Sequence, residues 1–216
     1  MKSICILSGG MDSTAAMAIA IENKREVVAL HFDYRQRTER KEREAFGKVA
    51  QFYGAKPYII DLPFFAAIGK SALTDYSIAV PSELSAKDKV PVTYVPFRNG
   101  IFLSIAAAIA EKEGANEIVL GAVEEDSSGY PDCRESFLEA QETAIKLGCA
   151  TGEIKISAPL VHLTKEQIVR EALRLNAPLR LTWSCYQNED RPCGVCESCR
   201  LRQKGFNLAG AKDPIL

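Results

Sequence analysis

Blocks of apolar residues separated by polar ones divide the chain into short and long segments that follow one another in turn. Short apolar runs with the length of buried strands occupy residues 3–7, 26–33, 57–61, 117–121 and 154–157. Longer segments with helical periodicity begin near residue 12 and then span 38–53, 101–111, 135–147 and 164–175. Because strands and helices alternate, we expect the α/β class, with a doubly wound parallel sheet of five strands and right-handed crossovers.

Local signals mark where some of these segments begin and end. Thr164 and Gln167 have the spacing of a capping box, and Gly54 stands where a helix is expected to stop. The periodicity weakens over residues 62–96, apart from a short predicted helix at 64–68. An insertion of this length is typical of a lid over a functional site, and a disordered surface loop is the alternative.

Composition and charge narrow the class of protein. A chain of 216 residues, 47% hydrophobic, can bury one sizeable core or a core with a small appendage. Its formal net charge is -1, from 27 Lys+Arg against 28 Asp+Glu, which argues against a nucleic-acid partner and favours a small-molecule substrate. No apolar run has the length of a membrane span, and only Met1 and Lys2 precede the first predicted strand, so we expect neither a membrane partner nor a cleavable signal. We therefore expect a cytoplasmic protein.

A glycine-rich turn joins the first predicted strand to the first helix. Two adjacent glycines let the backbone approach a ligand closely, and the N-terminus of the following helix favours an anion such as phosphate. The turn matches neither the P-loop lysine pattern nor the dinucleotide fingerprint. A plain βα turn with Ser13 near the helix N-cap is the alternative. The residues of this predicted nucleotide-binding turn are Leu7, Ser8, Gly9, Gly10, Met11, Asp12, Ser13 and Thr14.

Four cysteines lie close together near the C-terminus, at Cys185, Cys193, Cys196 and Cys199. In a reducing compartment, four thiolates at this spacing predict a closed, structural Zn²⁺ site. A redox pair is the alternative. We therefore divide the chain into a catalytic domain, residues 1–180, with its insertion at about 62–96, and a zinc-binding segment, residues 181–216. Of the remaining cysteines, Cys133 lies among candidate site residues and could be a nucleophile.

The turn S-G-G-x-D-S resembles the phosphate loop of the PP-loop ATP pyrophosphatases, whose sheet is Rossmann-like. Further motifs make the resemblance more specific. Together they resemble the motifs of the 7-cyano-7-deazaguanine synthases over residues 3–206. These motifs are F-D-Y at 32–34, Gln36-Arg37, Arg98-Asn99, S-G-Y-P-D-C-R at 128–134, Ser184-Cys185-Tyr186 and the cysteine cluster. Such proteins often have glycine, histidine and an aromatic residue at the positions of Arg35, Thr38 and Ser127, which puts the shape of the site's rim in question.

The resemblance implies ATP-dependent conversion of 7-carboxy-7-deazaguanine and ammonia into a nitrile, through an adenylated carboxylate and an amide, in queuosine biosynthesis. It implies ATP, Mg²⁺ and Zn²⁺ as cofactors, and a homodimer. Asp12, Ser13, Arg98 and Arg134 would be catalytic. The substrate-binding residues would be Tyr34, Arg37, Asn99, Glu124, Tyr130, Asp132 and Lys165.

Alternatives stay open for these assignments. Arg98 and Arg134 have the planar donors of phosphate or carboxylate clamps, yet surface salt bridges would also explain them. Lys165 could be solvated. At the level of function, a tRNA-modifying PP-loop enzyme of the thiolase or lysidine-synthetase type is the first rival, although no RNA-binding domain or basic surface is evident. A zinc-ribbon binding module without catalysis is the second, and it would not need the glycine-rich turn.

Overall fold

Five parallel strands form the central sheet of the computed structural model, which describes residues 1–82, 89–124 and 129–216. The strand order is β3-β2-β1-β4-β5, and every neighbouring pair is parallel. This topology confirms the predicted doubly wound sheet. The strands are β1 (Lys2–Ile6), β2 (Glu26–Asp33), β3 (Lys56–Asp61), β4 (Glu117–Leu120) and β5 (Lys155–Ser157).

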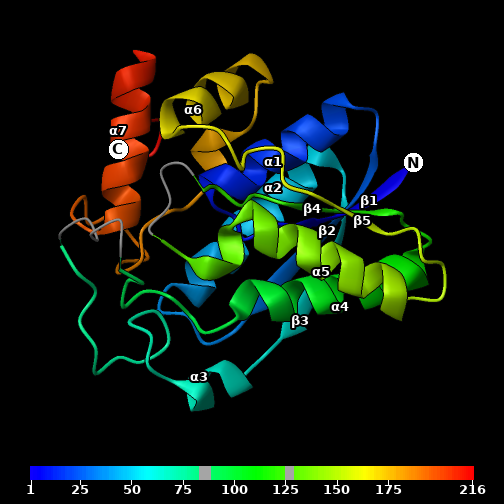
Figure 1. The fold of residues 1–216 in the computed structure, drawn as a ribbon. Helices are drawn as coiled ribbons and strands as arrows, with labels where there is room; N and C mark the ends of the chain where they lie inside the picture. Colours follow the sequence, from blue (N-terminus) through cyan, green and yellow to red (C-terminus); the bar gives the residue numbers. More distant parts are fainter. Residues whose placement is uncertain (83–88, 125–128) are drawn as a thin grey trace.

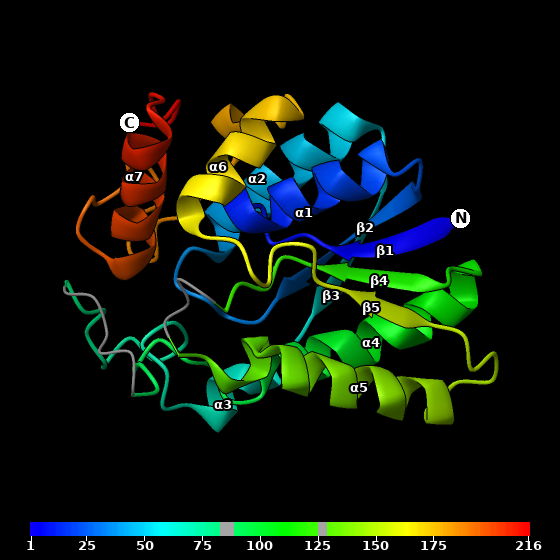
Figure 2. The ribbon, with the colours of Figure 1, turned by 45° about the horizontal axis from the view of Figure 1, so that its top comes forward.

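Helices cover both faces of the sheet (Figures 1 and 2). One face carries α1 (Met11–Glu22), α2 (Glu39–Tyr53) and α6 (Lys165–Arg174). The opposite face carries α4 (Arg98–Glu113) and α5 (Glu135–Gly148). Short 3-10 turns occupy Pro131–Cys133 and Leu179–Leu181. Among the residues that the structure describes, each helix is too short or too polar to cross a lipid bilayer.

The core is split into two layers by the sheet, because successive side chains of a strand point to opposite faces. Ile4 and Ile6 of β1 pack in the layer beneath α4, which also contains Leu103. Cys5 and Leu7 pack in the layer beneath α1, α2 and α6. The central strands β1, β2 and β4 are largely buried on both sides, which explains why they are continuous apolar runs, whereas β3 at the edge of the sheet is partly exposed.

Two predicted helix ends are confirmed. Thr164 Oγ1 accepts a hydrogen bond from the Gln167 amide, and the Gln167 side chain accepts one from the Thr164 amide, so the capping box is complete. Gly54 ends α2 in the left-handed conformation that glycine adopts readily.

One helix was not predicted. α7 (Glu197–Ala209) follows the last two cysteines of the cluster and packs beside α6 (Figure 2). Phe206 of α7 is 1% exposed and lies in the same core layer as Ile168 of α6. The sequence of α7 has few apolar residues, so its helical signal is weak and its stability comes from packing against α6.

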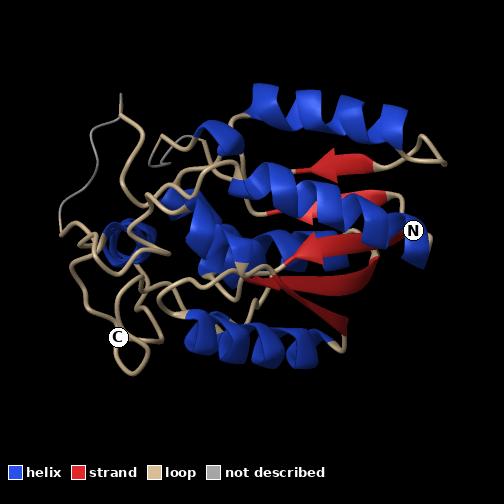
Figure 3. Cartoon of the chain, turned by 90° about the horizontal axis from the view of Figure 1, so that it is seen from below, coloured by secondary structure: helices blue, strands red, loops and turns tan. Residues whose placement is uncertain are grey.

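The insertion at 62–96 begins with the predicted short helix, α3 (Phe64–Ile68). Arg37 holds the part that follows, because its guanidinium donates hydrogen bonds to the carbonyls of Ala72, Asp75 and Ile78. Residues 83–88 of the insertion lie outside the described residues, and so do positions 125–128, which include Ser127 and Ser128. The carboxyl ends of the strands face the insertion and α7 (Figure 3). Ligands of such sheets bind beyond the carboxyl ends of the strands, so we expect the site there.

Candidate active site

The glycine-rich turn lies at the C-terminal end of β1 and leads directly into α1. Gly9 has φ +88°, a conformation that residues with a side chain rarely adopt. The Ser8 and Ser13 hydroxyls lie 3.0 Å apart, and the Ser8 amide donates to Ser13 Oγ at 3.2 Å. The first amides of a helix have no partner within the helix, so this turn presents donors suited to phosphate.

Neighbouring elements hold the turn in place by close contact. A Cβ atom on Gly9 would lie 2.7 Å from the carbonyl oxygen of Glu42 in α2. A Cβ atom on Gly121, just after β4, would lie 2.8 Å from the Ser13 amide nitrogen. Neither position leaves room for a side chain, so α2 and the end of β4 clamp the turn from both sides.

Asp12 and Lys165 join the turn to α6. Lys165 Nζ lies 2.6 Å from Asp12 Oδ2, although the two residues are 153 positions apart. Lys165 is 7% exposed, so it is not the solvated lysine that the sequence left as an alternative. The other Asp12 oxygen, Oδ1, is buried and has no hydrogen-bond partner among the described residues. A metal ion or a water molecule would satisfy it.

A cavity of about 250 Å³ opens beside the turn. Most of the predicted site residues line it, and the apolar part of its wall includes the ends of the strands, Phe102 of α4 and Trp183 of the C-terminal segment. The predicted residues that line it are Leu7, Ser8, Gly10, Met11, Asp12, Ser13, Tyr34, Arg37, Asn99, Arg98, Tyr130, Cys133 and Lys165.

Arg98 begins α4 and reaches into this cavity. Its guanidinium donates to the Tyr34 hydroxyl at 3.0 Å and lies 5.5 Å from the centre of the Tyr34 ring. Burial raises the pKa of Tyr34 to about 12, so the phenol keeps its proton and does not neutralise the arginine. Arg98 Nε is buried and lacks a partner within the described residues. A cation with a free buried donor is suited to an anionic ligand.

Gly9 and Thr14 of the turn do not line the cavity, and neither do three of the predicted catalytic and substrate-binding residues. Asp132 Oδ2 accepts the backbone N–H of Asn99 at 2.9 Å, and burial raises the pKa of Asp132. Glu124 is exposed and accepts the Glu135 amide at the start of α5. Arg134 is exposed and immediately precedes α5. In this conformation Asp132 and Glu124 therefore support the starts of α4 and α5.

Cys133 lies in the cavity wall but has the environment of an ordinary buried thiol. Asn99 Nδ2 lies 3.2 Å from its sulfur. Burial raises the pKa of Cys133 to about 12, so the nucleophilic thiolate is scarce at neutral pH. These features argue against a nucleophilic role.

The cavity also contains side chains that the sequence analysis did not assign. Gln36, Thr38 and Glu42 line it on the side of α2. Thr38 Oγ1 donates to Glu42 Oε1 at 2.7 Å and lies 3.2 Å from the carbonyl oxygen of Cys185. The spacing of Thr38 and Glu42, one helical turn, was the available signal.

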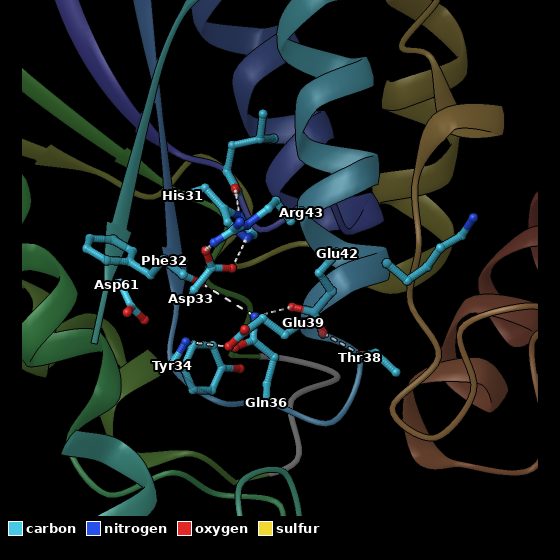
Figure 4. A network of polar contacts seen from close by, with 12 residues as sticks. His31, Phe32, Asp33, Tyr34, Gln36, Thr38, Glu39, Glu42, Arg43 and Asp61 are labelled. Carbon is cyan, nitrogen blue, oxygen red and sulfur yellow. Dashed lines mark hydrogen bonds and ion pairs between the residues drawn. The ribbon is translucent and has the colours of Figure 1, made fainter. Parts of the chain in front are cut away.

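A network of polar side chains from β2 and α2 contacts the start of the turn (Figure 4). His31 Nδ1 lies 3.0 Å from the carbonyl oxygen of Leu7, and Nε2 lies 3.4 Å from Asp33 Oδ1. Arg43 donates to the other oxygen of Asp33. Burial acts to raise the pKa of Asp33, but His31 and Arg43 outweigh it and the pKa falls below its ordinary value. The network therefore fixes the peptide that precedes Ser8.

The four predicted metal ligands come together. The sulfur atoms of Cys185, Cys193, Cys196 and Cys199 all lie within 4.8 Å of one another, and the cysteines form no disulfides. Zn²⁺ bound by four thiolates holds its sulfurs about 3.8 Å apart, so a small contraction would complete the site. The backbone amides of Asn188 and Cys193 point at Cys185 Sγ, which stabilises a thiolate. The donor set therefore fits a metal ion.

The segment that contains the four cysteines is attached to the glycine-rich turn. The Trp183 amide donates to the carbonyl of Gly9 at 2.9 Å. Arg202 of α7 is buried and donates to both oxygens of Asp213 and to the hydroxyls of Thr182 and Ser184. The segment is thus part of the cavity wall.

The five-stranded parallel sheet and the glycine-rich turn after β1 place the chain in the PP-loop ATPase class of folds. Solved structures share this fold. A 4-thiouridine synthetase in complex with RNA and ATP matches 97% of this chain and 50% of its own, with TM-score 0.54 and 17% identity. NMN synthetase from Francisella tularensis matches 98% and 77%, with TM-score 0.52 and 16% identity.

The sequence relationship is closer to one family. The family of queuosine biosynthesis protein QueC matches residues 2–210, and the chain belongs to this family. A 7-cyano-7-deazaguanine synthase from a Nitratiruptor species is 59% identical over 100% of this chain and 98% of its own. One from a Sulfurovum species is 60% identical over 99% and 97%. The tRNA-modifying alternative is therefore not favoured.

Proposed function

We propose that the chain converts 7-carboxy-7-deazaguanine and ammonia into 7-cyano-7-deazaguanine with ATP. One observation carries the proposal: the identity to proteins named 7-cyano-7-deazaguanine synthase extends over the whole chain. The cavity has the chemistry that this reaction needs, because a phosphate-binding turn and a buried arginine face the same space.

The reaction must first make a carboxylate reactive. Transfer of AMP to one carboxylate oxygen gives a mixed anhydride that ammonia attacks, with AMP as the leaving group. A second transfer, to the oxygen of the resulting amide, allows that oxygen to leave as AMP and the nitrile to form. Both transfers break the α–β bond of ATP, so one nucleotide site serves for both.

Residues of the cavity divide this work. Ser8, Ser13 and the amides of the turn hold the leaving pyrophosphate, and Lys165 offsets its charge. Arg98 holds the substrate carboxylate with its free donor. Tyr130 lies in the cavity wall and offers an aromatic face to the ring of the deazapurine.

Two metal ions would have different roles. Mg²⁺ would be held by the phosphates with the free oxygen of Asp12 and would stabilise charge on the pyrophosphate. Zn²⁺ would be held by the four cysteines and leave no open position for catalysis. The cytoplasmic location and the homodimer stay predictions, as do the ligand roles of Glu124, Asp132 and Arg134, which would require movement of their loop.

The proposal is tested by incubating the purified protein with the acid, ammonium and ATP and identifying the products by mass spectrometry. We expect the nitrile, and the amide at early times. A protein that binds ATP but returns the acid unchanged would overturn the proposal.

A further inference from the structure

The cavity contains two carboxylates among its described lining residues, Asp12 and Glu42. Asp12 is paired with Lys165. Glu42 has no ion pair within the described part of the chain, and its hydrogen-bond donors are the neutral side chains of Thr38 and Gln36, at 2.7 and 3.2 Å (Figure 4). Among the described residues, Glu42 is therefore the carboxylate of the cavity wall that has no ion-pair partner.

The Glu42 side chain can accept more hydrogen bonds than it receives. Each carboxylate oxygen has two lone pairs, and each is given one donor here. Burial raises the pKa of Glu42, while the Thr38 hydrogen bond and the charges of His31 and Arg98 oppose this. A partly buried carboxylate of this kind favours a ligand that is a cation or a hydrogen-bond donor.

The other reactants in the proposed reaction do not fit this position. ATP, pyrophosphate and the acid substrate are anions, which Glu42 repels. The donor edge of the deazaguanine ring lies on the six-membered ring, away from the carboxylate on the five-membered ring. Glu42 and Arg98 line the same cavity, so if Arg98 holds the carboxylate, Glu42 faces the space that contains the reacting carbon. Ammonia is mostly ammonium at neutral pH, and it must reach that carbon.

We propose that Glu42 is the ammonium site of this enzyme and takes the first proton from the bound ion. The proposal rests on the proposed function. In the step, ammonium gives one proton to the Glu42 carboxylate, and the nitrogen lone pair forms the C–N bond to the acyl adenylate. The C–O bond to AMP then breaks, AMP leaves with that electron pair, and the second surplus proton passes from nitrogen to water.

The two half-reactions distinguish ammonium binding by Glu42 from a role in binding ATP, Mg²⁺ or the ring, because only the first half-reaction uses ammonia. In Glu42→Gln, we expect the KM for ammonium in conversion of acid to amide to rise about tenfold to a hundredfold, as loss of a hydrogen-bonded charge partner commonly causes. Conversion of supplied amide to nitrile with ATP should stay within about twofold of the unmodified protein. Hydroxylamine is mostly neutral at neutral pH, so its conversion to the hydroxamate should also be little changed.

Glu44→Gln is the matched control, since Glu44 lies on the same helix, is partly exposed and pairs with Lys41 and Lys48. It should leave both half-reactions unchanged. An equal loss in both half-reactions of Glu42→Gln would overturn the proposal, because Glu42 would then serve ATP, Mg²⁺ or the ring. An unchanged KM for ammonium would overturn it as well.

A measurement on the unmodified protein covers the case in which Glu42→Gln does not fold. Guanidinium at millimolar concentration, a cation that does not replace ammonia as nucleophile, should inhibit the first half-reaction competitively with ammonium. It should leave amide conversion unaffected, and inhibition of both half-reactions or of neither would contradict the ammonium site. Amide conversion by the unmodified protein independently tests the proposed function, so the two proposals can fail separately.

Discussion

At the scale of single residues, the site depends on charged side chains that are held by partners far away in the sequence. Asp12 meets Lys165 from α6, and Arg98 from α4 meets Tyr34 after β2. Arg35 shows the effect of local geometry: its φ of +65° is in the left-handed region that favours glycine, and its guanidinium pairs with Asp61 at 2.7 Å and with Glu39 at 3.5 Å. These two ion pairs hold Arg35 in this conformation after β2.

Asp12→Asn tests the assignment of Asp12 to the pyrophosphate and its metal. The substitution keeps the size of the side chain but removes the charge, so we expect turnover to fall by about a hundredfold or more with the fold intact. Steady-state rates and circular dichroism measure the two effects. Glu22→Gln, at the other end of α1 and paired with Arg174, is the control and should leave the rate unchanged. An unchanged rate for Asp12→Asn would contradict the assignment.

Asp33→Asn tests the buried network beneath the turn. The Asp33 side chain has 0% exposure, and the substitution removes the charge that pairs with Arg43 and faces His31, so we expect a loss of about 3 kcal/mol in the free energy of unfolding at neutral pH. Urea titrations at a series of pH values measure this loss.

The pH dependence of that loss has a definite sign. The folded pKa of Asp33 lies below its ordinary value of 3.8, so ionised Asp33 stabilises the fold above pH 3.8. This stability is lost as the pH falls from 3.8 through the lower folded pKa. The difference between the unmodified protein and Asp33→Asn should therefore shrink in that range, and a difference that grows with acidification would contradict the network.

At the scale of elements, the strands and most helices were predictable because each one carries its own local signal, a short apolar run for a strand and a longer apolar or periodic segment for a helix. α7 was not, because its few apolar residues become a core face only beside α6. The glycine-rich turn and the four clustered cysteines are contiguous or closely spaced motifs, so the sequence indicated them. The spacing of Thr38 and Glu42 is also a local signal, whereas the pair between Asp12 and Lys165 depends on which elements meet across the cavity, and no local pattern contains that information.

Gly121→Ala and Gly47→Ala form a matched pair that tests the clamp on the turn. A Cβ at Gly121 would press on the backbone of Ser13 at 2.8 Å, so we expect a clear loss of turnover from displacement of the turn. A Cβ at Gly47, inside α2, would meet nothing within 4 Å, so that variant should keep its activity and gain about 0.5 to 1 kcal/mol in stability. Similar turnover in both variants would show that the close contact is not needed.

Removal of a metal ion from the four cysteines should destabilise the C-terminal segment. We expect about one zinc per chain in the isolated protein, measured by elemental analysis. A chelator should lower the melting temperature and shift the fluorescence of Trp183, the only tryptophan, which is 6% exposed and packs with Cys185, Cys196 and Cys199. Cys196→Ser should reproduce the loss of stability. Active, reduced protein without zinc would rule out the structural metal site.

At the scale of the whole molecule, one cavity is built from parts that are far apart in the chain. The turn comes from the first residues, Arg98 from the middle and Trp183 from the C-terminal segment, and all three line the same space. A two-step conversion in a single cavity needs the same nucleotide geometry twice. The chemistry of the turn can therefore be tested through the products of the complete reaction.

If the turn holds pyrophosphate, the enzyme should release AMP and pyrophosphate, two of each for every nitrile, because each adenylation breaks the α–β bond of ATP. Supplied amide should yield the nitrile with one ATP and without ammonium, since its nitrogen is already in place. Labelling both carboxylate oxygens of the acid with ¹⁸O gives the direct measurement: each adenylation transfers one substrate oxygen to AMP, so mass spectrometry should find both labels there. Label in inorganic phosphate, with ADP as the other product, would show that the turn phosphorylates the substrate instead and that the adenylation mechanism is wrong.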